Sequence, residues 1–241
     1  MSVSLRCYST SLGCPKNRVD TERLLGSLGV ALVPVESPDE AELVFINTCA
    51  FIQPATEESV RTIAQAIADI EELPKRPLLA VAGCLVGRYH AEDLAPELPE
   101  VDLWLDNSDL EAWPAMLARK LGLPEPTVPG RILSTGPSYA WLKISDGCRH
   151  ACSFCAIPNI RGGHRSHCKD MIVREARALL DQGVKELNLV AQDLTEWGCD
   201  LDGKQDLRTL LDGLLPLQGL ERLRLMYLYP AGMTHEMLKY L

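Results

Sequence analysis

Three cysteines that follow predicted strands at equal intervals constrain the fold of this chain more than any other feature. Cys14, Cys49 and Cys84 are 35 residues apart in each interval, and each stands between a strand-like apolar segment and a segment with helical periodicity. Units of this kind build a parallel sheet whose strands end at one common edge. The three thiols are therefore expected to converge there as a metal site, and the alternative is that each is a small buried apolar residue.

The alternation of apolar runs and helical patterns predicts an α/β fold with an open parallel sheet over residues 1–123. Strands are expected at 4–9, 31–35, 43–47, 78–82 and 101–105. Helices are expected at 19–28 with Gly29 as C-cap, at 37–40 as a short helix start, at 54–73, from 84 through Glu97, and up to Leu121 after a capping box of Ser108 and Glu111. Residues 124–137 contain four prolines and two glycines without periodicity, which predicts an interdomain linker.

The remaining residues, 138–241, predict a second parallel α/β domain. Strands are expected at 139–144, 186–191 and 222–226, and helices at 170–183 with Asp170 as the cap, at 206–215, and after Thr234. Three strands cannot close a barrel and leave one edge unpaired. We therefore expect either that another segment covers this edge or that the domain is incomplete.

A second group of cysteines lies in the loop after the first of these strands. Cys148, Cys152 and Cys155 place three soft thiol ligands within eight residues, which is typical of a compact metal centre. No fourth cysteine follows at ferredoxin spacing, so an iron-sulfur cluster here would keep one metal position open. Zinc is the alternative, with His150 or His164 as the fourth ligand.

Other polar residues are assigned more weakly. Lys143, Gln192 and Asp193 are expected at strand ends facing the cysteine loop, with no definite role. The basic residues of the loop either neutralise charge there or are simply solvated; they are Arg149, Arg161, Arg165 and Lys169. The nearby histidines, His164 and His167, are expected at the surface, with zinc ligation as the minor alternative. Cys7, Cys168 and Cys199 are interpreted as bystanders, and the dispersed Trp141, Trp197, Tyr227 and Tyr229 as core or pocket walls rather than a base-stacking platform.

Composition excludes several classes of function. A net charge of −9 argues against direct nucleic-acid binding through a basic surface. The N-terminus has no leader pattern, and the longest apolar run, 78–86, is too short for a membrane span, so a cytoplasmic protein without membrane contact is expected. Nine cysteines, an odd number in a chain of this size, favour metal ligation over disulfides.

Over nearly its whole length the sequence resembles the methylthiotransferases of the radical S-adenosylmethionine (SAM) superfamily. The resemblance rests on the CxxxCxxC loop at Cys148–Cys155 together with Cys14, Cys49 and Cys84. Further motifs resemble the branch that modifies an aspartate of a small-subunit ribosomal protein. They are Ser11–Asn17 (SLGCPKN), Ile46–Ile52 (INTCAFI), Gly83–Val86 (GCLV), Ala191–Asp193 (AQD) and Leu225–Tyr227 (LMY).

The resemblance implies a transferase with two 4Fe-4S clusters. Cys148, Cys152 and Cys155 would hold the cluster that binds and cleaves SAM, and Cys14, Cys49 and Cys84 an auxiliary cluster that carries the transferred sulfur. It implies a methylthiotransferase domain at 1–123, a linker at 124–137 and an incomplete radical SAM partial barrel at 138–241, without the C-terminal TRAM domain of the family. The alternatives are methylthiolation of a tRNA adenosine and a non-catalytic iron-sulfur fragment, and the electron donor and sulfur source are not indicated.

Overall fold

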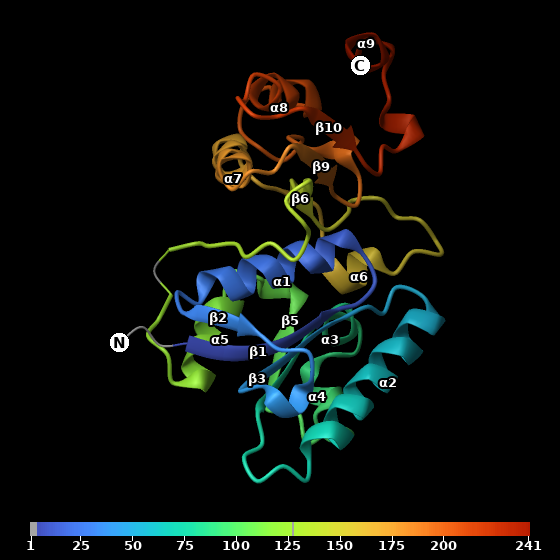
Figure 1. Ribbon diagram of the computed structural model, residues 1–241. Coiled ribbons are helices and arrows are strands. Elements are labelled where there is room, and N and C mark those ends of the chain that lie inside the picture. The colour runs from blue at the N-terminus through green and yellow to red at the C-terminus, as the bar shows by residue number, and fades with distance from the viewer. Residues whose placement is uncertain (1–3, 127) are drawn as a thin grey trace. The chain divides into compact units, whose positions relative to one another are not determined.

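The chain divides into two separately packed units, each of which is α/β. The computed structural model describes residues 4–126 and 128–241, and the units are Met1–Ile132 and Leu133–Leu241 (Figure 1). The division lies within the predicted linker 124–137. Residues 1–3, where the sequence predicts no leader, and residue 127 of the predicted linker lie outside the described residues.

Unit 1 is built on a five-stranded, wholly parallel sheet, as the recurring strand-cysteine-helix pattern predicts. The strand order is β2-β1-β3-β4-β5. The strands are β1 (Ser4–Ser11), β2 (Ala31–Pro34), β3 (Leu43–Thr48), β4 (Leu78–Gly83) and β5 (Leu103–Asp106). All six residues of β3 are buried, because helices cover both faces of the sheet at its centre.

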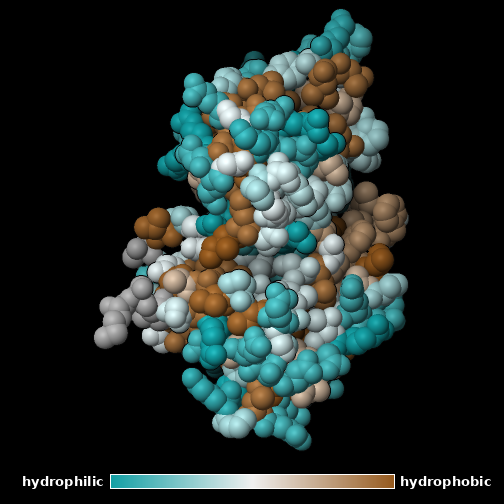
Figure 2. Space-filling view, viewed as in Figure 1, coloured by the Kyte–Doolittle hydropathy of each residue, from teal (hydrophilic) through white to brown (hydrophobic). Residues whose placement is uncertain are grey.

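Two layers of helices enclose this sheet. Helices α1 (Pro15–Ser27) and α5 (Trp113–Leu121) pack on one face, where Leu24, Leu25 and Trp113 join the apolar core. Helix α2 (Gln53–Ile70) covers the other face through Ile63 and Ala66, and its outer surface is largely hydrophilic (Figure 2). Short elements complete the unit: α3 (Cys84–Tyr89), α4 (Ala91–Leu94) and the 3-10 turns η1 (Pro38–Glu40) and η2 (Asn107–Asp109).

Three details of unit 1 differ from the predictions. Helix α1 begins at Pro15 instead of residue 19, because its first turn buries polar residues that apolar periodicity cannot detect. The stretch from 84 to 97 is broken at His90, whose φ of 60° is incompatible with a continuous helix. Ser108 is not a cap: Asp106 accepts a hydrogen bond from its backbone N–H, and α5 starts later.

Part of the predicted linker is packed against α1. The backbones at Gly26 and Gly130 approach so closely that a Cβ on either would clash with the other segment. Arg131 forms a 2.6 Å ion pair with Glu22, and both side chains are almost fully buried. Residues 130–132 therefore belong to unit 1 rather than to a loose connection.

Unit 2 contains a three-stranded parallel sheet with the order β10-β9-β6. Its strands are β6 (Tyr139–Lys143), β9 (Glu186–Val190) and β10 (Arg222–Leu225), and its helices are α6 (Ile157–Arg161), α7 (Lys169–Asp181), α8 (Leu207–Leu214) and α9 (His235–Tyr240), with 3-10 turns η3 (Leu194–Glu196) and η4 (Pro230–Gly232). The strands pack against α7 and α8 in one apolar core that includes Leu142, Leu189 and Leu210.

Of the two caps predicted in unit 2, Thr234 is confirmed and Asp170 is wrong, and Asp206 is a cap that was not predicted. The Asp206 side chain accepts a hydrogen bond from the backbone N–H of Thr209 at the start of α8. The Thr234 side chain accepts one from the backbone N–H of Met237 at the start of α9. Asp170 does not cap α7: it lies in the first turn, because the helix begins at Lys169.

An antiparallel pair that the sequence did not predict joins β7 (Ser145–Asp146) to β8 (Arg165–Ser166). Within the described residues, none of the helices has the length and apolarity needed to span a bilayer.

Candidate metal centres

The structure brings Cys14, Cys49 and Cys84 together at the carboxyl edge of the unit 1 sheet. Cys14 precedes the first residue of α1, Cys49 directly follows β3, and Cys84 is the first residue of α3. The strands before them, β1, β3 and β4, are adjacent in the sheet. A Cβ on Gly13, whose φ is +82°, would lie 2.6 Å from Cys49 Sγ, so this turn must carry glycine for the two cysteine segments to approach.

Buried polar side chains fix the turns that carry these thiols. Asn17 Nδ2 donates to Thr48 O (2.8 Å), and Asn47 Nδ2 donates to Asn17 O (2.8 Å). Ser59 Oγ accepts from Cys49 N (3.0 Å) and donates to Cys49 O (2.6 Å). These positioning roles were not predicted, and the only signal for them in the sequence is the polarity of Asn17 and Asn47 close to the cysteines.

The electrostatic environment of this triad opposes the free thiolate. A hydrogen bond with Cys84, together with burial, raises the pKa of the Cys49 thiol well above its usual range. Asn107 Nδ2 lies 3.8 Å from Cys84 Sγ as a weak donor, and Asn107 Oδ1 is buried without a partner. Thiols that share hydrogen bonds in a buried pocket must lose their protons when a metal binds.

Cys148, Cys152 and Cys155 surround one turn of the loop between β7 and α6. Cys155 N donates to Cys152 O (3.0 Å), and Cys148 N donates to Gly162 O (3.2 Å) where the chain returns. Gly147, with a φ of +66°, approaches the backbone at Gly163 too closely for any side chain. Burial raises the pKa of Cys148, and the neighbouring thiols add to the effect.

A buried charge network anchors the start of this loop. Asp146 accepts from Lys143 Nζ (2.8 Å) and His167 Nε2 (3.0 Å), and Arg161 Nη1 lies 3.4 Å away. Burial raises the pKa of Asp146, but Lys143, His167 and Arg161 outweigh it and hold the pKa well below its usual range. Arg161 is therefore a buried structural cation, so of the two alternatives for the basic residues of the loop, simple solvation is wrong at Arg161.

The end of β9 contributes the other side of the loop. His150 Nε2 lies 2.8 Å from Asp193 Oδ2, and the His150 ring packs on Tyr229 with a centroid distance of 4.6 Å. Next to Asp193, both amide atoms of Gln192 are buried without a hydrogen-bond partner. An orphan buried amide in a folded protein needs an explanation, and a bound polar ligand is a common one.

The spacing of the thiols bears on the choice between zinc and a cluster. Thiolates bonded to one zinc at about 2.3 Å lie about 3.8 Å apart, whereas each cluster thiolate binds a different iron and stands further from the others. Among the described residues, the groups of metal-ligand atoms that all lie within 4.8 Å of each other are His164–Cys199–Asp200 and His150–Asp193–Glu196, and neither cysteine triad is among them. At least one pair of thiols in each triad is therefore further apart than two ligands of one zinc, which is compatible with an iron-sulfur cluster.

The histidines proposed as a fourth zinc ligand of the Cys148–Cys155 loop have other contacts. His150 is bound to Asp193, and His164 Nε2 lies 3.0 Å from Ser166 Oγ. The prediction of surface histidines is wrong for His164 and His167, whose side chains are 3% and 17% exposed. Trp197 is buried as expected, and its indole N–H donates to His167 O.

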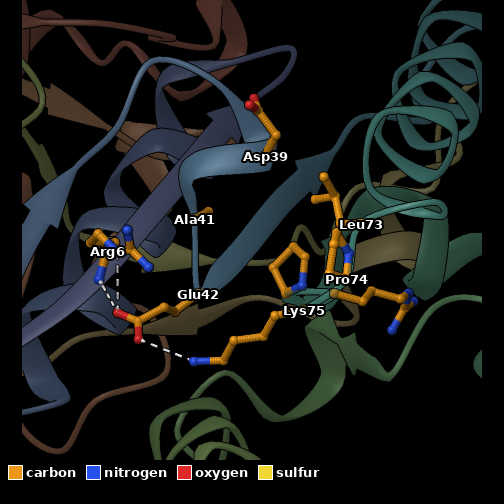
Figure 3. Close-up of a pocket in the computed structure, with 9 residues that line it drawn as sticks. Arg6, Asp39, Ala41, Glu42, Leu73, Pro74 and Lys75 are labelled. Carbon is orange, nitrogen blue, oxygen red and sulfur yellow. Dashed lines mark hydrogen bonds and ion pairs between the residues drawn. The ribbon is translucent and has the colours of Figure 1, made fainter.

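A hollow of about 300 Å³ lies at the opposite edge of the unit 1 sheet. There Glu42 accepts from the backbone N–H of Arg6 and faces Lys75 at 4.0 Å (Figure 3). The hydrogen bond from Arg6 lowers the pKa of Glu42. The hollow is lined mostly by charged residues and prolines, together with Ala41 and Leu73, and the cysteines lie at the other end of the strands.

Comparison with known proteins gives one family and a set of close relatives. Residues 6–106 match the family described as "Uncharacterized protein family UPF0004". The chain is 68% identical over 97% of its length to a protein of Nitratidesulfovibrio vulgaris (strain DP4), and 59% identical over 100% of its length to one of Lawsonia intracellularis, both named "Ribosomal protein uS12 methylthiotransferase RimO". It covers 54% and 55% of these relatives, so the chain spans about half the length of the curated relatives it matches.

Solved structures support the fold. The radical S-adenosylmethionine methyltransferase TsrM from Kitasatospora setae aligns with a TM-score of 0.50 and 12% identity, over 81% of this chain and 50% of that chain. The cobalamin-dependent S-adenosylmethionine radical enzyme OxsB aligns with a TM-score of 0.52 and 14% identity, over 89% of this chain and 37% of that chain. At these identities the likeness concerns the fold alone.

Proposed function

We propose that this chain, which is 59–68% identical to two proteins named as uS12 methylthiotransferases, belongs to the methylthiotransferase family and takes part in methylthiolation of an aspartyl residue of ribosomal protein uS12. We propose two 4Fe-4S clusters, one held by Cys14, Cys49 and Cys84 and one by Cys148, Cys152 and Cys155, with SAM bound at the second. The two relatives at 59–68% identity carry the uS12 assignment by name. The activity, the aspartyl target and the ribosomal partner are proposals for the protein as a whole.

The observation that carries this proposal is the presence of two separate thiol triads, each at the carboxyl end of a parallel sheet and each with three cysteines. Three ligands leave one metal position open, and a fourth protein thiolate would occupy it. Bound clusters of this kind supply an electron to SAM at one centre and a sulfur-carrying iron at the other. The remaining tasks, which are binding, orientation and exclusion of water, are performed by this chain's own residues.

The contacts around the second triad suggest how these tasks are divided. Asp146, held by Lys143 and Arg161, fixes the start of the cysteine loop, and Asp193 fixes His150 within it. The unpartnered amide of Gln192 lies next to Asp193 at the end of β9, where ligands of parallel α/β sheets bind. We assign Gln192 to hydrogen bonding with a polar group of SAM.

Anaerobic reconstitution tests the proposal. We expect about eight irons and eight sulfides per chain, and cleavage of SAM when a reductant is added. Stoichiometric zinc without sulfide would overturn both cluster assignments. Eight irons without cleavage would support the alternative that this chain is a non-catalytic iron-sulfur fragment.

The substrate requires a separate experiment. A protein extended to the full length of its relatives is incubated with small ribosomal subunits and, in parallel, with tRNA, and the products are analysed by mass spectrometry. We expect a methylthio group on an aspartate of uS12. Modification of a tRNA adenosine alone would contradict the proposed substrate.

A further inference from the structure

Three side chains of metal-binding type meet in unit 2 outside both cysteine triads. They are His164, just before β8, and Cys199 and Asp200, in the turn after η3. Their ligand atoms lie within 4.8 Å of one another, and the distance from His164 Nε2 to Asp200 Oδ1 is 3.6 Å. Nitrogen and oxygen ligands bonded to one zinc at 2.0–2.2 Å lie about 3.4 Å apart, so this pair already stands near the required separation.

We propose that His164, Cys199 and Asp200 form a zinc site with a fourth position for water. Imidazole, thiolate and carboxylate are the three ligand types that zinc takes in proteins, whereas iron-sulfur clusters are held chiefly by thiolates. The group His150–Asp193–Glu196 does not qualify in the same way. Its histidine and aspartate are in direct hydrogen-bond contact at 2.8 Å, which is too short for two ligands of one ion.

Contacts behind the ligands orient them. Ser166 N donates to Asp200 Oδ2 (2.8 Å), so the other carboxylate oxygen faces His164. Ser166 Oγ accepts from Gly198 N (2.9 Å), which joins the two segments, and it lies 3.0 Å from His164 Nε2, where zinc would take the place of this contact. Outer contacts of this kind are typical of metal sites, where they fix ligand geometry.

Charge at the site is compatible with a cation. Asp200 supplies a carboxylate oxygen 3.6 Å from His164 Nε2. The Arg149 side chain lies beside Cys199. The positive charge of Arg149 is offset by its ion pair with Glu196 at 3.3 Å.

The position of the site suggests a structural task. It would join the segment 164–166 to the turn 198–200, and β8 pairs with β7 immediately before Gly147 and Cys148. A bound ion would therefore fix the strand pair from which the cysteine loop starts. This inference does not depend on the proposed function, because it concerns zinc content and local order rather than catalysis.

The test compares Cys199→Ser with Cys168→Ser, a matched change at another exposed cysteine. Each chain is reconstituted with iron and sulfide, freed of loose metal, and titrated with zinc in competition with a chelating indicator. We expect one zinc per chain in the parent and in Cys168→Ser, and an affinity more than about 100-fold lower in Cys199→Ser, because loss of even an orienting outer contact costs roughly 10- to 100-fold. Equal zinc affinity in all three would overturn the site.

Two further readouts separate this site from the triads. Cobalt(II) in place of zinc should give a thiolate charge-transfer band in the parent and in Cys168→Ser but not in Cys199→Ser. Zinc should also slow amide exchange in 162–166 and 198–200 in the parent only. If clusters do not form, the proposed function fails, but the comparison of the two serine variants still decides the zinc site. A zinc content lower by one ion per chain in Cys199→Ser than in Cys168→Ser supports the site, and equal zinc contents contradict it.

Discussion

At the scale of single residues, Asp146 is the position where one atom change should have the largest effect on unit 2. Its carboxylate faces three basic groups while being almost fully buried. Replacing Asp146 with Asn removes the negative charge that faces the buried Lys143 and Arg161. Removing one partner of a buried ion pair lowers the free energy of unfolding by about 3–5 kcal/mol. We expect faster amide exchange throughout β6 and β9. The control Asp181→Asn, at the exposed end of α7, should leave exchange unchanged.

Gln192 should respond in opposite directions in two measurements. In the free chain its buried amide has no partner, and an unsatisfied buried polar group destabilises the fold. Gln192→Ala should therefore unfold at the same temperature as the parent or higher, yet bind SAM roughly 3- to 10-fold more weakly in the reconstituted chain, because one hydrogen bond is lost. Equilibrium dialysis with labelled SAM measures the second effect. Unchanged affinity, equal to that of the exposed control Gln182→Ala, would remove Gln192 from the ligand site.

Prediction from sequence worked best for residues whose neighbours are set by topology. Cys14, Cys49 and Cys84 converge because parallel strands share an edge, so spacing alone was sufficient. His164 and Cys199 meet through a two-residue strand pair and a turn, and nothing in the sequence links them. Burial of Arg161 was missed for a similar reason, since its partner Asp146 is recognisable only once the loop is folded.

At the scale of elements, the turn between β1 and α1 depends on Gly13. Gly13→Ala would place a Cβ 2.6 Å from both Cβ and Sγ of Cys49, so that cysteine must move. Gly29→Ala is a matched control, because Gly29 has a similar positive φ of 67° but no atom within 4 Å of the added Cβ. Both variants bear a conformational cost of roughly 1–2 kcal/mol. Only Gly13→Ala should also lose about half of the reconstituted iron, and equal iron in both would contradict a cluster beside Gly13.

Helix α8 depends on its N-cap. Asp206→Ala should lower the stability of unit 2 by about 1 kcal/mol, and Asp206→Asn should retain most of it, since the amide oxygen still accepts from Thr209 N. Partial burial raises the pKa of Asp206, but hydrogen bonds from Thr209 and Arg208 bring it below its ordinary value. The free energy of unfolding is thus higher with Asp206 than with Asn above pH about 4, and this difference is lost as the pH falls through the pKa of Asp206 in the folded state. Urea unfolding at several pH values measures it, and a difference independent of pH would contradict the role of the charge.

Element types were predictable where apolar periodicity was strong, and element boundaries were not. The strands of both sheets and helices α2 and α8 lie near their predicted ranges. Helix α1 starts four residues earlier than expected, because its first turn is buried through the hydrogen bonds of Asn17 rather than through apolar residues. Likewise, the proline-rich segment suggested a free linker, whereas Arg131 is held by Glu22 through a buried ion pair.

At the scale of the whole molecule, each triad lies entirely within one unit that has its own core. The two proposed clusters should therefore form independently. Replacing Cys14, Cys49 and Cys84 together with Ala should leave about four irons per chain and preserve the change in the electron paramagnetic resonance spectrum on adding SAM. Replacing Cys148, Cys152 and Cys155 together with Ala should also leave about four irons but abolish that change.

The control for both triple variants is Cys168→Ala, which alters an exposed cysteine outside the triads and should keep about eight irons. Circular dichroism identifies any variant that fails to fold. Loss of nearly all iron from one folded triple variant would mean that a single cluster draws ligands from both units. Because the sheets of the two units pack in separate cores, such a result would contradict the assignment of one complete ligand set to each unit.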